Sequence, residues 1–169
     1  MTAVDVETVL FDLDDTLCRY RRTGDELLEV AFERTGLDAA LSALEDLPLG
    51  VVTNGAPKMQ SAKLAGLGLG DAFDVVVHAG YDAPAKPSPA PFREALSALD
   101  ARPERTYHVG NSLSSDVAGA RAAGVGAVWL TGEEPAAASD EEPDPNPDPE
   151  PEPDHAVATL AELPGVLGR

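Results

Sequence analysis

Short apolar segments alternate with stretches of helical periodicity along this chain, and that order constrains the fold more than any other feature. Five segments have the length and apolar composition of buried strands, at residues 8–11, 49–53, 73–78, 106–109 and 127–130. Helical patterns occur at residues 25–34, 38–47, 57–65, 91–99 and 115–123. Buried strands separated by helices indicate a parallel sheet covered on both faces. The sequence therefore predicts an α/β fold with a three-layer, Rossmann-like parallel sheet, which residues 155–169 rejoin as a short strand or turn and a small helix.

The composition excludes several classes of protein. The 169 residues include 30 acidic and 12 basic side chains, and the formal net charge of -18 would repel nucleic acid and anionic membranes. A single cysteine, Cys18, excludes a disulfide framework and a cysteine-rich zinc site. No apolar run approaches the length of a membrane span, and the N-terminus lacks the residue order of a signal peptide. We therefore expect a soluble cytoplasmic protein that binds neither nucleic acid nor membrane; the oligomeric state is left open.

Much of the acidity lies in residues 133–154, which hold ten acidic residues, seven prolines and no basic residue. Alternating prolines and acidic residues cannot bury apolar surface, so we expect an extended, disordered insert. It divides one core domain into residues 1–132 and 155–169. The insert is interpreted either as a solvated spacer or as an acidic arm for a basic partner. Outside this insert the chain is still acidic, and its basic residues are nine arginines and only three lysines. An acid-rich, lysine-poor composition resembles that of proteins from salt-accumulating cells.

Polar residues follow four of the predicted strands, at the edge of a parallel sheet where ligands bind. They are Asp12 and Asp14 after the first strand, Thr53 and Asn54 after the second, Lys86 after the third, and Asn111 and Asp116 after the fourth. Clustered carboxylates without His or Cys favour Mg²⁺, and they can also serve as nucleophile and general acid/base. A threonine hydroxyl and backbone amides at a helix start, together with a lysine held between prolines, suit a phosphate group.

Each of these residues also has a plain structural interpretation. Aspartates after a strand, Asp15 included, favour turns and helix caps. Thr-Asn-Gly is a common turn, and an isolated lysine such as Lys86 would be a surface residue of a proline-rich loop. Asp116 suits the first turn of a helix. The combination is more specific than any of its parts.

Taken in order, the motifs resemble those of the haloacid dehalogenase-like (HAD) superfamily, whose members are mostly Mg²⁺-dependent phosphatases. The four motifs are Asp12-Leu13-Asp14-Asp15-Thr16, Thr53 in Val-Val-Thr-Asn-Gly, Lys86 in Ala-Lys-Pro-Ser-Pro, and Gly110-Asn111 followed by Asp116. The resemblance covers nearly all of residues 5–131 and the short tail from Asp154. Within the superfamily, the chain is similar to the phosphoglycolate-phosphatase-like branch.

The resemblance implies a chemical role for each residue. Asp12 would attack phosphorus and form an aspartyl-phosphate, while Asp14 would protonate the leaving group and later activate water. Thr53, the Asn54 amide and Lys86 would bind the phosphoryl group, and Lys86 would also balance charge. Asp14 favours a phosphatase over a dehalogenase, because a halide leaving group needs no proton. The expected substrate is a small phosphorylated metabolite.

The resemblance also implies a Mg²⁺ site, and here the chain departs from the family pattern. The ligands would be Asp12, the carbonyl oxygen of Asp14, Asn111 and Asp116. The fourth motif usually begins Gly-Asp, so Asn111 removes one negative charge from the site. This departure implies either a weaker metal site or lost activity.

A second departure concerns the helical cap that members of this subtype carry between the first and second motifs. Asp12 and Thr53 are only 41 residues apart, and the helical patterns in residues 18–47 are too short for a closing bundle. The sequence therefore predicts a vestigial helical cap and an open site. Three basic residues after the first motif would either attract an anionic substrate or face solvent: Arg19, Arg21 and Arg22. The alternative to a phosphatase is a catalytically weak or inactive HAD-fold protein that serves as a binding or interaction module.

Overall fold

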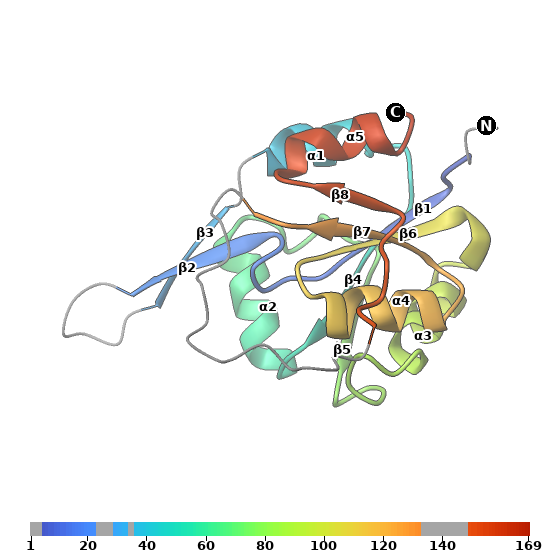
Figure 1. Ribbon diagram of the computed structural model, residues 1–169. Helices are drawn as coiled ribbons and strands as arrows, with labels where there is room; N and C mark the ends of the chain where they lie inside the picture. The colour runs from blue at the N-terminus through green and yellow to red at the C-terminus, as the bar shows by residue number, and fades with distance from the viewer. Residues whose placement is uncertain (1–4, 23–28, 34–35, 133–148) are drawn as a thin grey trace, which may run out of the picture.

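The computed structural model describes residues 5–22, 29–33, 36–132 and 149–169, with residues 19–22 and 29–33 described by their backbone alone. Six parallel strands form one sheet in the order β5-β4-β1-β6-β7-β8 (Figure 1). Their bounds are β1 Thr8–Phe11, β4 Leu49–Asn54, β5 Val75–Ala79, β6 Thr106–Gly110, β7 Gly126–Leu130 and β8 His155–Val157. The five predicted strands are confirmed, with ends that differ by at most two residues, and the tail supplies the sixth strand.

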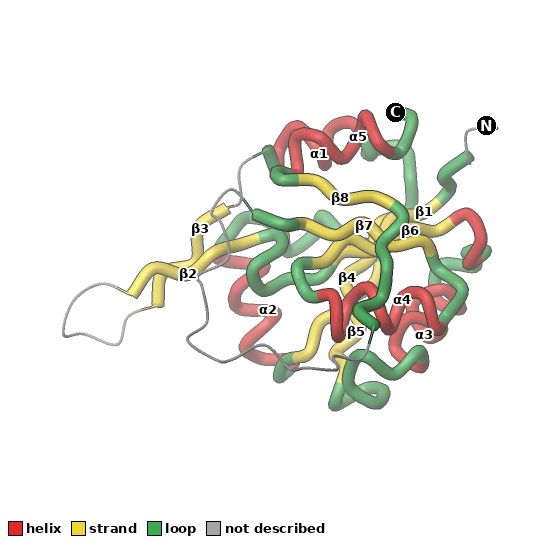
Figure 2. Tube along the Cα trace, in the orientation of Figure 1, coloured by secondary structure: helices red, strands yellow, loops and turns green. Residues whose placement is uncertain are grey.

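Side chains of the strands alternate between two apolar layers, as a sheet covered on both faces requires. Val9 and Phe11 of β1 belong to one layer and Leu10 to the other, and all three are fully buried. The first layer includes α1 Leu37–Ala43, α2 Pro57–Gly66 and α5 Leu163–Val166, and the second includes α3 Ala90–Ala98 and α4 Ala118–Ala122 (Figures 1 and 2). The predicted three-layer α/β fold is therefore confirmed.

Two of the predicted helices differ in detail from the helices in the structure. The segment at 115–123 begins as a π-helical turn over Leu113–Val117 and only then continues as α4. The segment at 38–47 forms α1, which ends at Ala43. Leu37 and Ala40 of α1 pack in the first apolar layer together with Leu163 of α5. This helix is therefore part of the core domain and not of a cap.

The helix predicted at residues 25–34 is wrong over its described part. Glu29–Glu33 form strand β3, which pairs antiparallel with strand β2, Cys18–Arg22. In Glu-Val-Ala-Phe-Glu, a β-branched and an aromatic residue recur at every second position, which favours a strand. The same apolar residues also fit a helical period, because so short a segment does not separate the two patterns. In place of the expected helical cap, the structure has a β-hairpin, which extends away from the sheet (Figure 1).

The acidic insert ends against the core. Residues 133–148 lie outside the described residues, so their disorder stays a prediction. At the end of the insert, the Asp154 N–H donates to the Ala127 carbonyl at 2.8 Å. The Asp154 carboxylate accepts from the Ala127 N–H at 2.8 Å and from Arg121 at 2.7 Å. These contacts lead the chain into β8, which pairs in parallel with β7.

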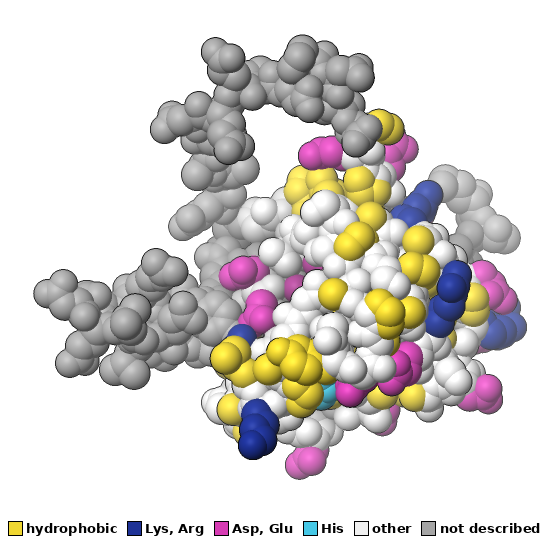
Figure 3. Space-filling view, turned by 90° about the horizontal axis from the view of Figure 1, so that it is seen from below, with side chains coloured by type: hydrophobic (Ala, Val, Ile, Leu, Met, Phe, Trp, Pro, Cys, Tyr) yellow, Lys and Arg dark blue, Asp and Glu magenta, His cyan; other side chains and the backbone are white. Residues whose placement is uncertain are grey.

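Exposed acidic side chains occur in several separate parts of the described chain, among them Asp38, Glu45 and Asp71. On the face that Figure 3 shows, they lie among hydrophobic and uncharged side chains and do not gather in a single patch. Among the helices of the described ranges, none is long and apolar enough to cross a membrane.

Candidate active site

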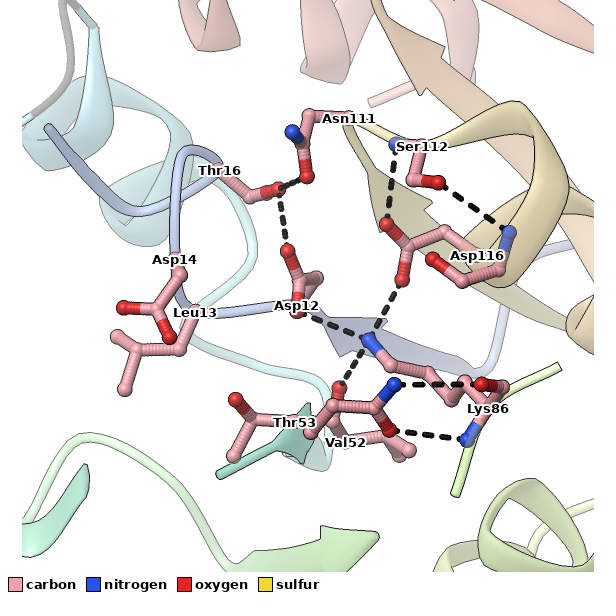
Figure 4. A network of polar contacts seen from close by, with 12 residues as sticks. Asp12, Leu13, Asp14, Thr16, Val52, Thr53, Lys86, Asn111, Ser112 and Asp116 are labelled. Atoms are coloured by element: carbon pink, nitrogen blue, oxygen red, sulfur yellow. Dashed lines mark hydrogen bonds and ion pairs between the residues drawn. The ribbon is translucent and has the colours of Figure 1, made fainter. Parts of the chain in front are cut away.

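The ammonium group of Lys86 lies at the centre of a buried polar network at the carboxyl end of β1 (Figure 4). Its Nζ donates to Asp12 Oδ1 at 2.9 Å, to Asp116 Oδ1 at 2.6 Å and to the carbonyl of Val52 at 2.9 Å. Lys86 and Asp12 are each 6% exposed, and Asp116 is 1% exposed. We call Asp12, Lys86, Asp116 and His108, which contacts Asp116, the buried network. It joins residues of the first, third and fourth motifs, as the sequence predicted.

The position of Lys86 is set by the side chain of Asn54, at the end of β4. Asn54 Oδ1 accepts from the Lys86 N–H at 2.9 Å, and its Nδ2 donates to the Lys86 carbonyl at 3.2 Å. This pair of hydrogen bonds ties the loop after β5 to the end of the neighbouring strand. The sequence predicted a phosphate-binding backbone amide for Asn54 but did not predict this contact of its side chain.

Asp116 is held by the segment that follows β6. Its Oδ2 accepts from the Ser112 N–H at 3.1 Å, and its Oδ1 lies 3.0 Å from His108 Nε2. A Cβ atom at Gly110 would lie 2.3 Å from the Asp116 Cγ, so only glycine leaves room for this carboxylate. The Asp116 carboxylate therefore points into the core and accepts hydrogen bonds there, in addition to lying in the first turn of a helix.

Burial and charge shift the pKa values of the network in different directions. Burial raises the pKa of Asp12 from 3.8 to about 7, although Lys86 favours the carboxylate. Burial acts in the same direction on Asp116, but hydrogen bonding and charge from His108 and Lys86 lower its pKa to about 2. Burial opposes the ammonium of Lys86, but its two carboxylate neighbours outweigh burial and raise its pKa. Of the two carboxyl groups in the network, Asp12 is the one whose neutral form is favoured.

Asp14 lies apart from the Lys86 ammonium (Figure 4), and its carboxyl group contacts α2 instead. Its Oδ1 accepts from Lys63 Nζ at 2.9 Å and its Oδ2 accepts from Gln60 Nε2 at 3.0 Å. The next residue, Asp15, is exposed and has a φ of 62°, a left-handed conformation that Asp tolerates. Asp14 and Asp15 thus take different positions, one against a helix and one in solvent.

Thr53 follows the apolar residues of β4, and its hydroxyl lies at the carboxyl-end edge of the sheet, as the Asp12 carboxyl does. The residue is 1% exposed, and its Oγ1 accepts from Gln60 Nε2 at 2.7 Å. Thr53 and Asp14 therefore contact the same amide group of α2, although they belong to different motifs.

Oxygen atoms of the first and fourth motifs meet around Thr16. Thr16 Oγ1 lies 3.1 Å from Asp12 Oδ2 and 3.5 Å from Asn111 Oδ1. Trp129 Nε1 donates to the Asn111 carbonyl at 3.1 Å and fixes the backbone there. In the ranges that the structure describes, no three His, Cys, Asp or Glu side chains group as metal ligands. The donors here are carboxylate, amide and backbone oxygens, a set that fits a hard cation such as Mg²⁺.

Four residues that contact the predicted ones were given no role from the sequence, although Thr16 belongs to the first motif: Thr16, Gln60, Lys63 and His108. Gln60 and Lys63 are three residues apart on α2, directly after the second motif, so their shared helix face was a usable signal. His108 lies two residues before Gly110 in a buried strand, where a polar residue is unusual. The side chains of the three arginines of β2 are not described, so their role stays a prediction.

Comparisons with known proteins show which family the chain is similar to. The family model for haloacid dehalogenase-like hydrolases matches residues 26–124, more than half of the chain. A phosphoserine phosphatase from Thermus thermophilus is 44% identical over 98 residues, which are 56% of this chain and 39% of the relative. A ribulose-1,5-bisphosphate 5-phosphatase from Halopiger xanaduensis is 33% identical over 119 residues, 70% of this chain and 49% of the relative. The chain thus spans about two-fifths to half of the length of these relatives.

Solved structures extend the likeness to residues outside the matched range. A HAD phosphatase from Thermococcus onnurineus is 34% identical, with a TM-score of 0.65 over 82% of this chain and 59% of its own. An L-2-haloacid dehalogenase from Xanthobacter autotrophicus, only 17% identical, has the same fold, with a TM-score of 0.75 over 96% of this chain and 98% of its own. Motif order, fold and family model agree: the chain belongs to the haloacid dehalogenase-like hydrolase family.

Proposed function

We propose that the protein is a Mg²⁺-dependent phosphatase that hydrolyses a small phosphate monoester through an aspartyl-phosphate intermediate. The observation that carries this proposal is the contact of the Asp12 carboxylate with the Lys86 ammonium at 2.9 Å, at the carboxyl end of β1. Buried carboxyl groups with shifted pKa values cluster at functional sites, and the adjacent ammonium of Lys86 favours the ionised, nucleophilic form of Asp12 and offsets the charge of an incoming phosphate. The named phosphatases among the relatives support the same reaction class.

In the first step, an Asp12 oxygen attacks phosphorus as the bond to the leaving oxygen breaks, and Asp14 gives a proton to that oxygen. In the second step, Asp14 takes a proton from water, the water oxygen attacks phosphorus, and the bond to Asp12 breaks. Thr53, the Asn54 amide and Lys86 hold the phosphoryl oxygens throughout. Catalysis of this kind depends mainly on positioning and on charge neutralisation.

Mg²⁺ would be held by oxygens of Asp12, the Asp14 backbone, Asn111 and Asp116. When bound, the ion supplies positive charge that neutralises the phosphoryl oxygens. Because Asn111 is uncharged, we expect a high half-saturating Mg²⁺ concentration, and Asn111→Asp should lower it. An unchanged Mg²⁺ titration in Asn111→Asp would contradict this assignment of Asn111.

The proposed substrate class is a small phosphorylated metabolite. The named relatives are phosphatases of different substrates, and the chain matches only part of each, so the proposal is limited to the substrate class. Strands β2 and β3 contain five residues each, and so small a pair of strands is proposed to leave the site open to solvent. A screen of phosphorylated metabolites would name the substrate.

Hydrolysis of p-nitrophenyl phosphate, with Mg²⁺ and with EDTA, tests the reaction class. The wild-type protein should release p-nitrophenol only with Mg²⁺, and Asp12→Asn should lose about 10⁴-fold or more in kcat/KM. Activity that persists in Asp12→Asn would remove the nucleophile assignment. No activity of the wild type at any Mg²⁺ or salt concentration would favour the alternative, a HAD-fold binding module, which the uncharged Asn111 also favours.

A further inference from the structure

Gln60, in the first turn of α2, is a buried polar residue that none of the four motifs contains. It is 0% exposed, and its amide nitrogen lies between two residues that do belong to motifs. Nε2 is 2.7 Å from Thr53 Oγ1 and 3.0 Å from Asp14 Oδ2. We propose that Gln60 is a positioning residue that orients the phosphate-binding hydroxyl of Thr53 and the acid/base carboxyl of Asp14 together. This inference rests on the proposed phosphatase function.

The hydrogen-bond inventory gives Gln60 a defined effect on Thr53. The ionised carboxylate of Asp14 only accepts hydrogen bonds, so the amide edge that faces it is the NH₂ group. When Asp14 carries the proton for the leaving group, its Oδ2 still has a lone pair to accept this bond. Each of its two hydrogens then has one acceptor, Asp14 Oδ2 or Thr53 Oγ1. Because Thr53 accepts from Gln60, its own hydroxyl proton is left to donate to a phosphoryl oxygen, which has no hydrogen of its own to give. Gln60 therefore sets the direction in which Thr53 donates.

The packing around Gln60 keeps its amide in place. The Gln60 backbone N–H donates to the Ala56 carbonyl at 3.0 Å, which anchors the residue in the first turn of α2. A Cβ at Gly55 would lie 2.6 Å from both Cδ and Nε2 of Gln60, so Gly55 leaves room for the amide plane. Gln60 contacts the Asp14 oxygen next to the one that accepts from Lys63 at 2.9 Å. Two residues of one helix thus hold the two oxygens of one carboxyl.

The carbonyl oxygen of the Gln60 amide indicates that this arrangement lowers the stability of the fold. Gln60 Oε1 is buried and has no hydrogen-bond partner within the described residues. An unsatisfied buried acceptor destabilises a fold, and an apolar side chain of similar size would remove that penalty. A glutamine at this position is therefore better explained by the two hydrogen bonds that it donates at the site than by the stability of the core.

Gln60→Met tests the proposal, because methionine is similar in length and volume but donates no hydrogen bond. The matched control is Lys58→Met, since Lys58 lies on the same helix and is exposed. The measurement is kcat/KM for p-nitrophenyl phosphate and for phenyl phosphate, which have similar shapes but leaving groups of different basicity. This parameter reports the first phosphoryl transfer, in which the leaving oxygen needs the proton of Asp14. Inhibition by tungstate, a tetrahedral oxyanion, reports phosphate binding separately.

We expect Gln60→Met to lose about 100-fold in kcat/KM for phenyl phosphate and only about 10-fold for p-nitrophenyl phosphate. Its inhibition constant for tungstate should rise about 10-fold, because the Thr53 hydroxyl is no longer directed. Its unfolding midpoint should stay at or above that of the wild type, and Lys58→Met should change none of these values more than about twofold.

Equal losses for both substrates, with unchanged tungstate inhibition, would overturn the inference while leaving the proposed function intact. A wild-type protein that hydrolyses neither substrate would overturn the proposed function and this inference with it. A lower unfolding midpoint together with equal losses would assign Gln60 to the core, and would also overturn the positioning role.

Discussion

The paired strands β1 and β6 have a cluster of charged residues at each end, and the two clusters differ in almost every physical respect. At the carboxyl ends lies the buried network around Lys86. At the amino ends, Arg105 Nη1 lies 2.8 Å from Glu7 Oε1 and 3.2 Å from Asp5 Oδ2, and Arg102 also pairs with Glu7. We call this second group the exposed cluster: Asp5, Glu7, Arg102 and Arg105. Both clusters consist of ion pairs, but only one of them is removed from water.

The difference in burial decides what each cluster can contribute. An exposed ion pair contributes little to stability, because water and salt screen it and long side chains lose entropy. Burying charged groups costs several kcal/mol in desolvation free energy, which is far more than the stabilisation that an exposed ion pair provides. Removal of one partner of a buried pair leaves the other charge buried without a counter-charge. The buried network also shifts pKa values strongly, as functional sites often do. This difference in burial supports the proposal that the buried network is the active site, while the exposed cluster is a surface feature.

Lys86→Met should have the largest effect on stability. The substitution removes the cation between Asp12 and Asp116 and leaves two carboxylates facing each other in a buried setting. We expect a loss of about 3–5 kcal/mol in the free energy of unfolding at neutral pH, together with loss of activity. Urea unfolding measures the change, and Lys58→Met is the matched control on an exposed lysine. Equal stabilities of the two variants would contradict the central role of Lys86.

The pH dependence of stability should separate Asp12 from the rest of the network. The folded-state pKa of Asp12 is about 7 and its ordinary value is 3.8. Between these values the folded protein binds a proton that the unfolded chain releases, so this contribution to stability falls as pH rises to about 7. His108 contributes in the opposite direction, because burial lowers its pKa and its neutral form is favoured.

Comparison with Asp12→Asn isolates the effect of Asp12. In metal-free buffer, the melting temperature of Asp12→Asn relative to the wild type should increase by about 5 °C between pH 5 and pH 8. Asn cannot ionise, while Asp12 of the wild type becomes charged over this range. A constant difference between the two proteins would show that burial does not raise the pKa of Asp12.

Much of the fold was predictable because its pattern is local. Each strand of the sheet is a short apolar run, and the polar residues after the strands reach one edge because the strands are parallel. Sequence patterning failed at residues 25–34, where five described residues fit both periods and pairing with β2 determined the outcome. Local patterns of that length do not separate a helix from a strand.

Within the site, the sequence identified the residues of the four motifs but not most of the side chains that hydrogen-bond to them. Asp12, Lys86 and Asp116 meet as expected, although they are up to 104 positions apart in the sequence. The contact of Asp14 with α2 was not predictable, because it depends on how the first layer packs against the loop after β1. The same holds for His108, whose contact with Asp116 requires both the end of β6 and the π-helical turn.

Salt should act on the surface and leave the buried network unchanged. The net charge of -18 implies repulsion among exposed carboxylates, and the Debye length falls from about 10 Å at 0.1 M salt to about 3 Å at 1 M. We therefore expect the unfolding midpoint to rise between dilute and molar KCl. The stability difference between the wild type and Lys86→Met should change little, because buried pairs are screened weakly. A midpoint that does not rise would contradict the salt-adapted surface.

The smallest effect is expected from Arg102→Met in the exposed cluster. The substitution removes the ion pair between Arg102 and Glu7, but Glu7 still pairs with Arg105 at 2.8 Å and remains accessible to water. The unfolding midpoint should therefore decrease only slightly at low salt, and the decrease should disappear in 1 M KCl. Phosphatase activity should stay within about twofold of the wild type, because surface substitutions away from a site act locally. If Arg102→Met lowered kcat/KM tenfold, the two ends of β1 and β6 would be coupled, and burial alone would no longer explain the difference between the two clusters.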